Sequence, residues 1–295
     1  MKARSHTLLY LLIAAMVLFW SANYIIGKIA LREFPPLLLC GLRVGLAGLV
    51  MIPAYLAQGG EATWGKRDLP MLLYLGLFGV TLNQLFFLLG LSRTSVVHSV
   101  LIISMTPIFV LIIAALMKQE RITVRKAGGM LIAIAGVGIL HALPSSDAAT
   151  AAQPTLLGDF FVFLAAATFA GYTVFGKTVS LRHSAITVNT FCYVGGALAL
   201  APMTLYQARN FSFGGVSATG WSTLVYMALF PSVICYLIYY YALGIISASR
   251  VSAFSYLQPV IATLMAAVAL REHVTLPMVA GGAVIFSGVY LTERG

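Results

Sequence analysis

The chain has 295 residues, of which 60% are hydrophobic and only 9% are charged. Soluble domains typically carry about 25% charged residues, so this composition excludes a water-soluble globular protein. Lys and Arg number 18 against 8 Asp and Glu, and the placement of this excess decides between a nucleic-acid partner and a membrane.

Apolar segments follow one another along nearly the whole chain. A helical span of a bilayer needs roughly 20 apolar residues, and continuously apolar runs exclude the alternating strands of a β-barrel. Lys2 and Arg4 resemble the start of a signal peptide, but the run continues to Ala30, which is too long for a signal core. We predict an all-α membrane protein with ten transmembrane helices, near residues 7–27, 35–57, 69–91, 95–117, 124–142, 156–176, 185–206, 219–243, 248–270 and 275–292.

The loops between these spans differ in charge. When the spans alternate in direction, most Lys and Arg fall on the side of the N-terminus, and the loop at 143–155 carries none. Cytoplasmic loops are enriched in Lys and Arg, so we predict cytoplasmic N- and C-termini and an extracytoplasmic loop at 143–155. Membrane topology thus explains the positive charge, and the sequence predicts no nucleic-acid partner.

The two halves of the chain resemble each other in register. Lys28 corresponds to Lys177 at an offset of 149 residues, and Pro107 corresponds to Pro259 at an offset of 152. Five spans per half is an odd number, so the second half enters the membrane in the opposite sense, as in many secondary transporters. We predict two inverted five-helix repeats, at 1–142 and 156–295, joined by the linker 143–155.

Acidic residues lie only in loops and at the ends of the predicted spans. A proton-coupled carrier that uses a buried carboxylate needs one within a span, so the sequence predicts facilitated diffusion or exchange. No phosphate-binding loop, metal motif or nucleophile–base motif is present, so we expect no cofactor and no metal. A membrane enzyme or an assembly factor is the less favoured alternative.

Arg43 is the one charged residue well inside a predicted span, and it has no acidic neighbour in sequence. It either binds a substrate carboxylate or extends to the membrane interface. His98 begins the fourth span, where it titrates near neutral pH or bonds to the helix end.

Polar and aromatic residues gather on the first, third, fourth, sixth, eighth and ninth spans. They predict a cavity for a small, partly apolar molecule. In the alternative interpretation, the Tyr and Trp residues belong to aromatic belts at the membrane interfaces, and the Ser and Thr hydroxyls bond to the backbone of their own helix. The predicted substrate-binding residues are Trp20, Asn23, Tyr24, Arg43, Asn83, Phe87, His98, Ser104, Tyr172, Tyr236, Tyr239, Tyr240, Ser255 and Tyr256. The same spans carry Gln84, Thr106, Phe169 and Gln258 outside this set.

Prolines interrupt three of these spans. Pro107 and Pro259 each free a carbonyl in equivalent helices, and Pro231 lies where the first half has Gly79. We predict Pro107, Pro231 and Pro259 as hinges, with the halves differing at Pro231. Glycines at 124–142 and 275–292 predict close helix packing, as a scaffold or a dimer face, so the sequence leaves open a monomer or a homodimer.

Several of these features together resemble the EamA family of the drug/metabolite transporter superfamily, over essentially the whole chain. They are Trp20-Ser21-Ala22-Asn23 with Gly27-Lys28, Arg43, the stretch from Pro107 through Glu120-Arg121 to Gly129 and Gly136, and its repeat from Pro259 through Glu272 to Gly281 and Gly288.

This resemblance implies an exporter in the bacterial cytoplasmic (inner) membrane, because family members export amino acids and other metabolites. One member exports aromatic amino acids, which fits the aromatic spans. We therefore expect alternating-access export of small metabolites, most readily amino acids including aromatic ones, with a multidrug or nucleotide-sugar-like carrier as the alternative. Small multidrug relatives use an acidic residue in their first span, and its absence here argues against proton-coupled cation efflux.

Overall fold

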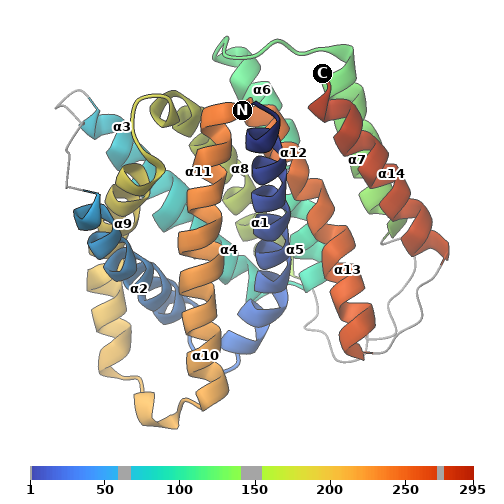
Figure 1. Ribbon diagram of the computed structural model, residues 1–295. Coiled ribbons are helices and arrows are strands. Elements are labelled where there is room, and N and C mark those ends of the chain that lie inside the picture. The colour runs from blue at the N-terminus through green and yellow to red at the C-terminus, as the bar shows by residue number, and fades with distance from the viewer. Residues whose placement is uncertain (1, 59–67, 141–154, 271–275) are drawn as a thin grey trace.

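The computed structural model describes residues 2–58, 68–140, 155–270 and 276–295, and all regular secondary structure in these residues is helical (Figure 1). The predicted linker 143–155, apart from Thr155, and Glu272 lie outside the described residues. The first half contains α1 (Lys2–Ala30), α2 (Pro36–Ala57), α3 (Leu69–Tyr74), η1 (Leu75–Leu82), α4 (Asn83–Leu91), α5 (Val96–Ile103), α6 (Thr106–Leu116) and α7 (Val124–Leu140). The second half contains α8 (Leu156–Ser180), α9 (Ala185–Arg209), η3 (Phe213–Gly215), α10 (Ala218–Met227), η4 (Ala228–Ile234), α11 (Cys235–Ile245), α12 (Ala248–Ala253), η5 (Phe254–Tyr256), α13 (Leu257–Leu270) and α14 (Leu276–Glu293).

Seven helical segments in the described residues are long and apolar enough to cross a membrane, and Val279–Glu293 is a shorter apolar helix. The expectation of an all-α, multi-pass membrane protein is therefore confirmed, while the count of ten spans stays a prediction. The seven segments are Thr7–Ala30, Pro36–Ala57, Leu69–Leu91, His98–Leu116, Leu156–Ser180, Ala185–Arg209 and Ala218–Ile245.

Serine and threonine caps start several helices. The hydroxyls of Ser95, Thr155, Ser184 and Ser217 each accept a hydrogen bond from the backbone N–H three residues later, at 3.1 Å. Such caps satisfy donors that a helix start leaves unpaired. Local capping residues therefore determine where α5, α8, α9 and α10 begin.

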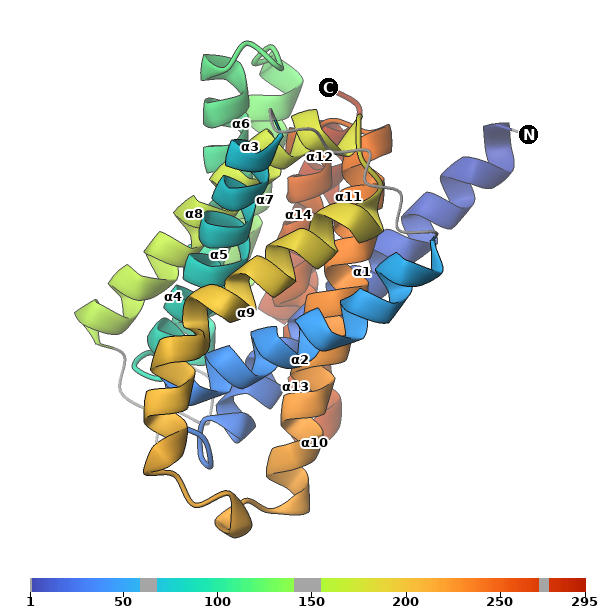
Figure 2. The same ribbon diagram turned by 90° about the vertical axis from the view of Figure 1, so that its left-hand side faces the viewer.

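Several helix pairs join the halves, and two of them lie on different sides of the bundle. Figure 2 shows α2 beside α9, and these helices pack together. At the other side of the bundle α7 packs against α14 (Figure 1), where a Cβ on Gly129 would lie 2.7 Å from the carbonyl oxygen of Gly288. Only glycine allows two backbones to approach this closely, which explains the glycines noted in these two segments.

Irregular helix geometry recurs at corresponding places in the two halves. The π-helical segment η1 interrupts 69–91 and the π-helical segment η4 interrupts 218–245, at the 152-residue offset of the repeat. Likewise, the turn between α5 and α6 precedes Pro107, and the 3₁₀ segment η5 precedes Pro259. Pro231 lies within η4 and Gly79 within η1. Both halves therefore adopt the π conformation here, and the difference between Gly79 and Pro231 as hinges stays a prediction.

Candidate functional site

A cavity inside the helix bundle is lined by both halves of the chain. Its volume is about 80 Å³, and one water needs about 10–15 Å³. The cavity therefore has room for several waters or one small molecule. Its lining residues are Trp20, Asn23, Tyr24, Arg43, Asn83, Gln84, Phe87, Ile103, Thr106, Phe169, Tyr236, Ser255 and Gln258.

Arg43 is the only charged residue among these lining residues. It belongs to the buried stripe of α2 that also contains Leu39, Cys40 and Ala47, so the helical period directs it inward. The side chain is 2% exposed, its Nε donates to the Ser232 hydroxyl at 2.8 Å, and its Nη1 has no hydrogen-bond partner. This burial excludes extension to the membrane interface and leaves a guanidinium N–H available in the cavity wall.

The π segment η4 supplies the acceptors that orient the site. The Pro231 carbonyl accepts a hydrogen bond from the Trp20 indole N–H at 3.1 Å, and the Ser232 carbonyl accepts one from the Tyr193 hydroxyl at 3.1 Å. The missing N–H of Pro231 frees the Met227 carbonyl, which accepts a hydrogen bond from the Ser232 hydroxyl at 2.8 Å. The Pro231 and Ser232 carbonyls hold a cavity-lining tryptophan and the tyrosine beside Arg43.

A second hydrogen-bond network centres on the hydroxyl of Tyr236. This hydroxyl accepts from the Gln84 amide at 3.3 Å and lies 3.2 Å from both the Gly79 carbonyl oxygen and the Asn83 Oδ1. Asn83 in turn donates to the Ala165 carbonyl at 2.8 Å. The network joins α4, α8 and α11, so it fixes the orientation of three cavity-lining side chains.

Neutral polar atoms of the cavity wall also lack partners. The Asn23 Oδ1 and the Thr106 hydroxyl are buried without a hydrogen bond, whereas the neighbouring Tyr24 hydroxyl donates to Gln258 Oε1 at 3.2 Å. Buried polar atoms are normally paired. Unpaired atoms in a cavity wall are therefore available to a ligand.

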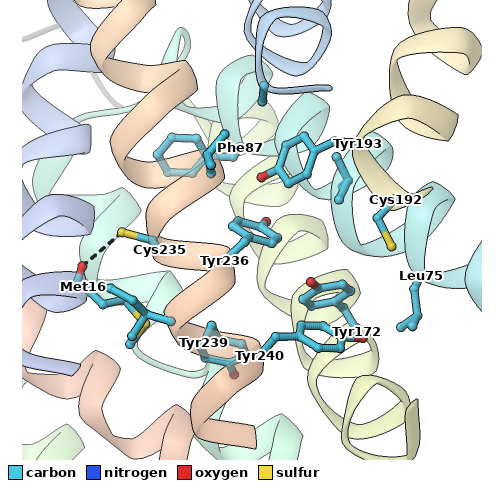
Figure 3. Packing of buried hydrophobic residues seen from close by; sticks show 14 of the residues in the cluster. Met16, Leu75, Phe87, Tyr172, Cys192, Tyr193, Cys235, Tyr236, Tyr239 and Tyr240 are labelled. Atoms are coloured by element: carbon cyan, nitrogen blue, oxygen red, sulfur yellow. Dashed lines mark hydrogen bonds between the residues drawn. The ribbon is translucent and has the colours of Figure 1, made fainter. Parts of the chain in front are cut away.

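Aromatic rings form one wall of the cavity. Trp20 meets Phe169 edge to face with 5.7 Å between ring centroids, and it meets Tyr236 at 6.2 Å. Behind this wall, Tyr236 packs between Tyr193 and Tyr172 (Figure 3). Edge-to-face pairs are favourable for aromatic rings, so the wall is a preformed apolar surface.

Eight of the predicted site residues line the cavity: Trp20, Asn23, Tyr24, Arg43, Asn83, Phe87, Tyr236 and Ser255. Three of the others form a layer outside the lining. Tyr172 packs against Tyr236 and Tyr240 at 5.6 and 5.7 Å between ring centroids, and the Tyr239 hydroxyl lies 2.7 Å from that of Thr173 (Figure 3). These rings support the wall rather than form it.

The remaining three predicted residues lie elsewhere. His98 Nδ1 is 3.0 Å from Asp159 Oδ2, where α5 meets α8. Ser104 donates to its own helix at the Val100 carbonyl, 2.8 Å away, and Tyr256 packs in the small apolar cluster beside α7 and α14. Sequence spacing predicts cavity-facing positions for these residues, but their side chains contact other helices or their own backbone.

Five lining residues were missing from the predicted set: Gln84, Ile103, Thr106, Phe169 and Gln258. Four of them are polar or aromatic residues on spans that were predicted to line the cavity: Gln84, Thr106, Phe169 and Gln258. The prediction therefore selected the correct spans but not every lining residue on them. Ile103 is neither polar nor aromatic. It enters the wall because α5 ends there, four residues before Pro107 in α6.

The described residues contain no group of three His, Cys, Asp or Glu side chains placed to hold a metal ion. The thiols of Cys40, Cys192 and Cys235 are free and buried. The chemistry of the cavity is thus one cation, several amides and hydroxyls, and aromatic rings.

The chain matches the family model described as the EamA-like transporter family, at residues 7–141 and 156–294. It is 30% identical to a transporter of Archaeoglobus fulgidus, over 97% of this chain and 98% of the relative. It is 28% identical to a probable amino-acid metabolite efflux pump of Salmonella typhimurium, over 95% and 93% of the two chains.

A third relative is a probable terminal-alkyne amino-acid exporter of Streptantibioticus cattleyicolor, which is 28% identical over 77% of this chain and 74% of the relative. Among solved structures, a crystal structure with 20% sequence identity aligns with a TM-score of 0.77 over 98% of this chain and 97% of that one. This last likeness concerns the fold alone.

Proposed function

The chain belongs to the EamA-like transporter family, and from this premise we propose that it exports small metabolites that carry a carboxylate, most readily amino acids including aromatic ones. It is a multi-pass membrane transporter of small molecules and not an enzyme. The residues that line the cavity support the proposed substrate class.

Arg43 carries the proposal for a carboxylate. An arginine does not lose its proton in proteins, and its guanidinium binds carboxylates through parallel N–H···O bonds. Here Nε is held by Ser232 while Nη1 is unpartnered in the cavity wall. A substrate carboxylate that approaches Arg43 gains a charge-assisted hydrogen bond. No other lining residue offers one, because Arg43 is the only charged residue in the lining.

The neutral groups of the cavity favour a zwitterion. The unpartnered Asn23 Oδ1 and Thr106 Oγ1 are acceptors for an ammonium group, and they add no negative charge. The wall formed by Trp20, Phe169 and Tyr236 offers ring edges and faces to an apolar or aromatic side chain. Two relatives named for amino-acid export support the same class.

We propose ten spans in two inverted repeats that rock against each other, so that the cavity opens to each side in turn. The recurrence of irregular geometry before Pro107 and Pro259 supports hinges at these two positions, and η4 supports one at Pro231. Both views place the chain ends at the same end of the bundle (Figures 1 and 2). With the Lys and Arg pattern, this supports termini on the cytoplasmic side of the inner membrane.

Transport without a proton gradient follows from the composition of the wall. Its lining residues include no Asp or Glu, so no carboxylate there takes up and releases a proton with the substrate. We therefore propose facilitated diffusion or exchange.

Uptake into liposomes that contain the purified protein tests this function. The substrates are phenylalanine, phenethylamine, which lacks the carboxylate, and phenylpropionate, which lacks the ammonium group. We expect saturable phenylalanine uptake that a pH gradient leaves unchanged, and no saturable uptake of phenethylamine. Equal transport of phenylalanine and phenethylamine would contradict the proposed carboxylate recognition.

Variants assign the result to the cavity. Arg43→Gln is expected to abolish phenylalanine uptake and Arg43→Lys to retain a fraction of it, because lysine keeps the charge but not the bidentate geometry. The exposed Arg294 provides the matched control Arg294→Gln, which should transport normally. If Arg43→Gln fails to fold, Asn23→Leu offers an independent test, with a greater loss for phenylalanine than for phenylpropionate.

A further inference from the structure

The charge of Arg43 has no counter-charge in the described residues around it. Its titratable neighbours are Tyr193, Tyr236, Cys40 and Cys235, and tyrosine and cysteine side chains are predominantly neutral at pH 7. The hydrogen bond that it makes within the described residues goes to a neutral hydroxyl. The cavity lining adds no acidic side chain, so the substrate-free site holds a positive charge that no described carboxylate offsets.

A buried charge in this condition is costly. Moving an ion out of water costs several kcal/mol even after relaxation of the protein, and arginine does not escape this cost by losing its proton. The Arg43 side chain is 2% exposed, so contact with bulk water offsets little of it. A small anion beside the guanidinium would offset part of it through charge attraction.

The cavity provides the space and the donors for such an anion. It has room for several water-sized particles. Elsewhere in the lining, the unpartnered Thr106 hydroxyl is able to turn its proton toward an anion. Both groups line the same cavity, which also borders Trp20.

We propose that the substrate-free carrier binds a monovalent inorganic anion, such as chloride, at Arg43, and that the substrate carboxylate displaces it. The anion site itself stands on the burial and missing partners of Arg43. The displacement step rests on the proposed function. Substrate and halide are then competing ligands of one guanidinium, and chloride raises the apparent KM for the substrate without changing the maximal rate.

Tryptophan fluorescence reports on this site directly. The chain has three tryptophans, and replacing Trp64 and Trp221 with Phe leaves Trp20, in the cavity wall, as the only tryptophan, which is excited selectively over the tyrosines. Iodide quenches tryptophan on contact. The protein in detergent is titrated with potassium iodide against potassium methanesulfonate at constant ionic strength, without substrate.

We expect a saturable quenching component that chloride reverses competitively. Arg43→Gln in the same background should weaken iodide binding at least about tenfold, whereas Arg294→Gln should leave it unchanged. Linear quenching of equal slope in the parent protein and Arg43→Gln would overturn the proposal.

A second measurement does not depend on the folding of an Arg43 variant. A ligand that binds only the native state raises its stability by mass action, so chloride should raise the unfolding temperature of the unmodified protein, and methanesulfonate at equal ionic strength should not. Equal unfolding temperatures in the two salts would count against the anion site.

Phenylalanine separates the anion site from the proposed function. If iodide quenching saturates and phenylalanine reverses it, both the site and the displacement are supported. Saturable quenching without phenylalanine uptake into liposomes keeps the anion site and overturns the substrate class. Phenylalanine uptake with only linear quenching keeps the function and overturns the anion site.

Discussion

The two π segments, η1 and η4, have the same backbone irregularity at corresponding places but different side chains at its centre. In η1, Gly79 provides space: a Cβ there would lie 1.8 Å from Cδ2 of Tyr172. In η4, Pro231 removes a backbone donor, and its carbonyl accepts the indole N–H of Trp20. One half uses the irregularity for close packing and the other uses it to orient the site.

The same division appears at Arg43. The 149-residue offset of the repeat pairs Arg43 on α2 with Cys192 on α9, and these two helices pack together. The cation comes from the first half, while its hydrogen-bond acceptor, Ser232, comes from η4 in the second. The repeat thus supplies a common frame, and unequal substitutions within it build an asymmetric site.

The largest expected effect is on stability, at Gly79. The Gly79→Ala substitution places a methyl group inside the ring of Tyr172, which is completely buried. Overpacking of a core typically costs about 1–3 kcal/mol, and we expect the upper end or more, because the obstacle is a rigid ring. The measurement is the free energy of unfolding in detergent, together with the folded yield.

Gly45 on α2 and Gly195 on α9 provide matched controls, because a Cβ at either meets nothing within 4 Å. Alanine at these positions should be neutral or slightly stabilising, since glycine weakens a helix. If Gly79→Ala is as stable as Gly45→Ala, the packing role assigned to η1 is wrong.

The next effect concerns two carboxylates of the first half that cap helices of the second. Glu33 accepts from the backbone and hydroxyl of Ser217 before α10, and Glu120 accepts from the Ser249 backbone N–H at 3.0 Å in α12. Glu120 also pairs with Lys126 at 2.6 Å, with side chains only 8% and 9% exposed. Hydrogen bonds to a charged group contribute about 1.5–3 kcal/mol, so Glu120→Gln should cost about 2–3 kcal/mol of unfolding free energy.

The effect of Glu120→Gln should depend on pH. Burial raises the pKa of Glu120, but hydrogen bonds from Lys126 and Ser249 lower the pKa by more than burial raises it. The pKa of Glu120 therefore lies below its ordinary value of 4.5. A carboxylate with a lowered pKa stabilises the native state fully above its unfolded pKa and loses this contribution as the pH falls through the folded value. The stability difference between parent and variant should therefore be constant above about pH 5 and shrink below about pH 4.

Glu33→Gln is the control for this prediction. Hydrogen bonds from Ser217 lower the pKa of Glu33, but its side chain is only partly buried, so water screens its interactions. Its substitution should change stability less than Glu120→Gln. An equal or larger loss at Glu33 would refute the importance given to burial.

Much of the fold follows from the sequence, because span length, capping hydroxyls and paired glycines are local signals. Serine caps at Ser95 and Ser217 fix helix starts, and Gly129 and Gly288 indicate the contact of α7 with α14. The repeat also places the irregular segments. The π conformation of η1 was not foreseen, since Gly79 alone specifies no helix type and its neighbour Tyr172 lies far away in sequence.

The site is less predictable, since a polar helix face does not say what it faces. Tyr236 and Tyr240 share a face by spacing, yet Tyr236 borders the cavity and Tyr240 packs behind Tyr172. His98 lies opposite Asp159, a partner 61 residues away. These outcomes depend on the rotation of each helix in the bundle, which the packing of all helices together decides.

A smaller effect is expected for the hydrogen bond that η4 has and η1 lacks. Trp20→Phe keeps an aromatic ring but removes the bond to the Pro231 carbonyl. One neutral hydrogen bond contributes about 1 kcal/mol to stability, so the free energy of unfolding should fall by about this much, and the KM for phenylalanine should rise because the ring in the cavity wall is no longer held. Trp221→Phe, at a partly exposed ring of α10, should leave the KM unchanged, and equal KM values for the two variants would show that the bond does not orient the site.

The smallest expected effect concerns Lys28 and Lys177, a pair of residues that the two halves have kept equivalent. Lys28 donates to the Thr94 carbonyl at 2.7 Å, and Lys177 donates to the carbonyls of Leu243 and Ile246, the latter at 2.9 Å. A cation at a helix C-terminus contributes about 0.3–1 kcal/mol, so Lys28→Met and Lys177→Met should each cost about this much, with the larger loss at Lys177, which has two acceptors.

The two lysines should also act independently. Thr155, at the start of α8, bonds to the Arg93 carbonyl beside the site of Lys28, and a rise of 1.5 Å per residue then places Lys177 about 30 Å away along α8. Distant sites add within about 0.3–0.5 kcal/mol, so the double variant should lose the sum of the single losses. A double loss well above that sum, measured by unfolding in detergent, would mean that the two ends of the bundle are coupled, and the lysines would then be parts of one conformational switch rather than two separate helix caps.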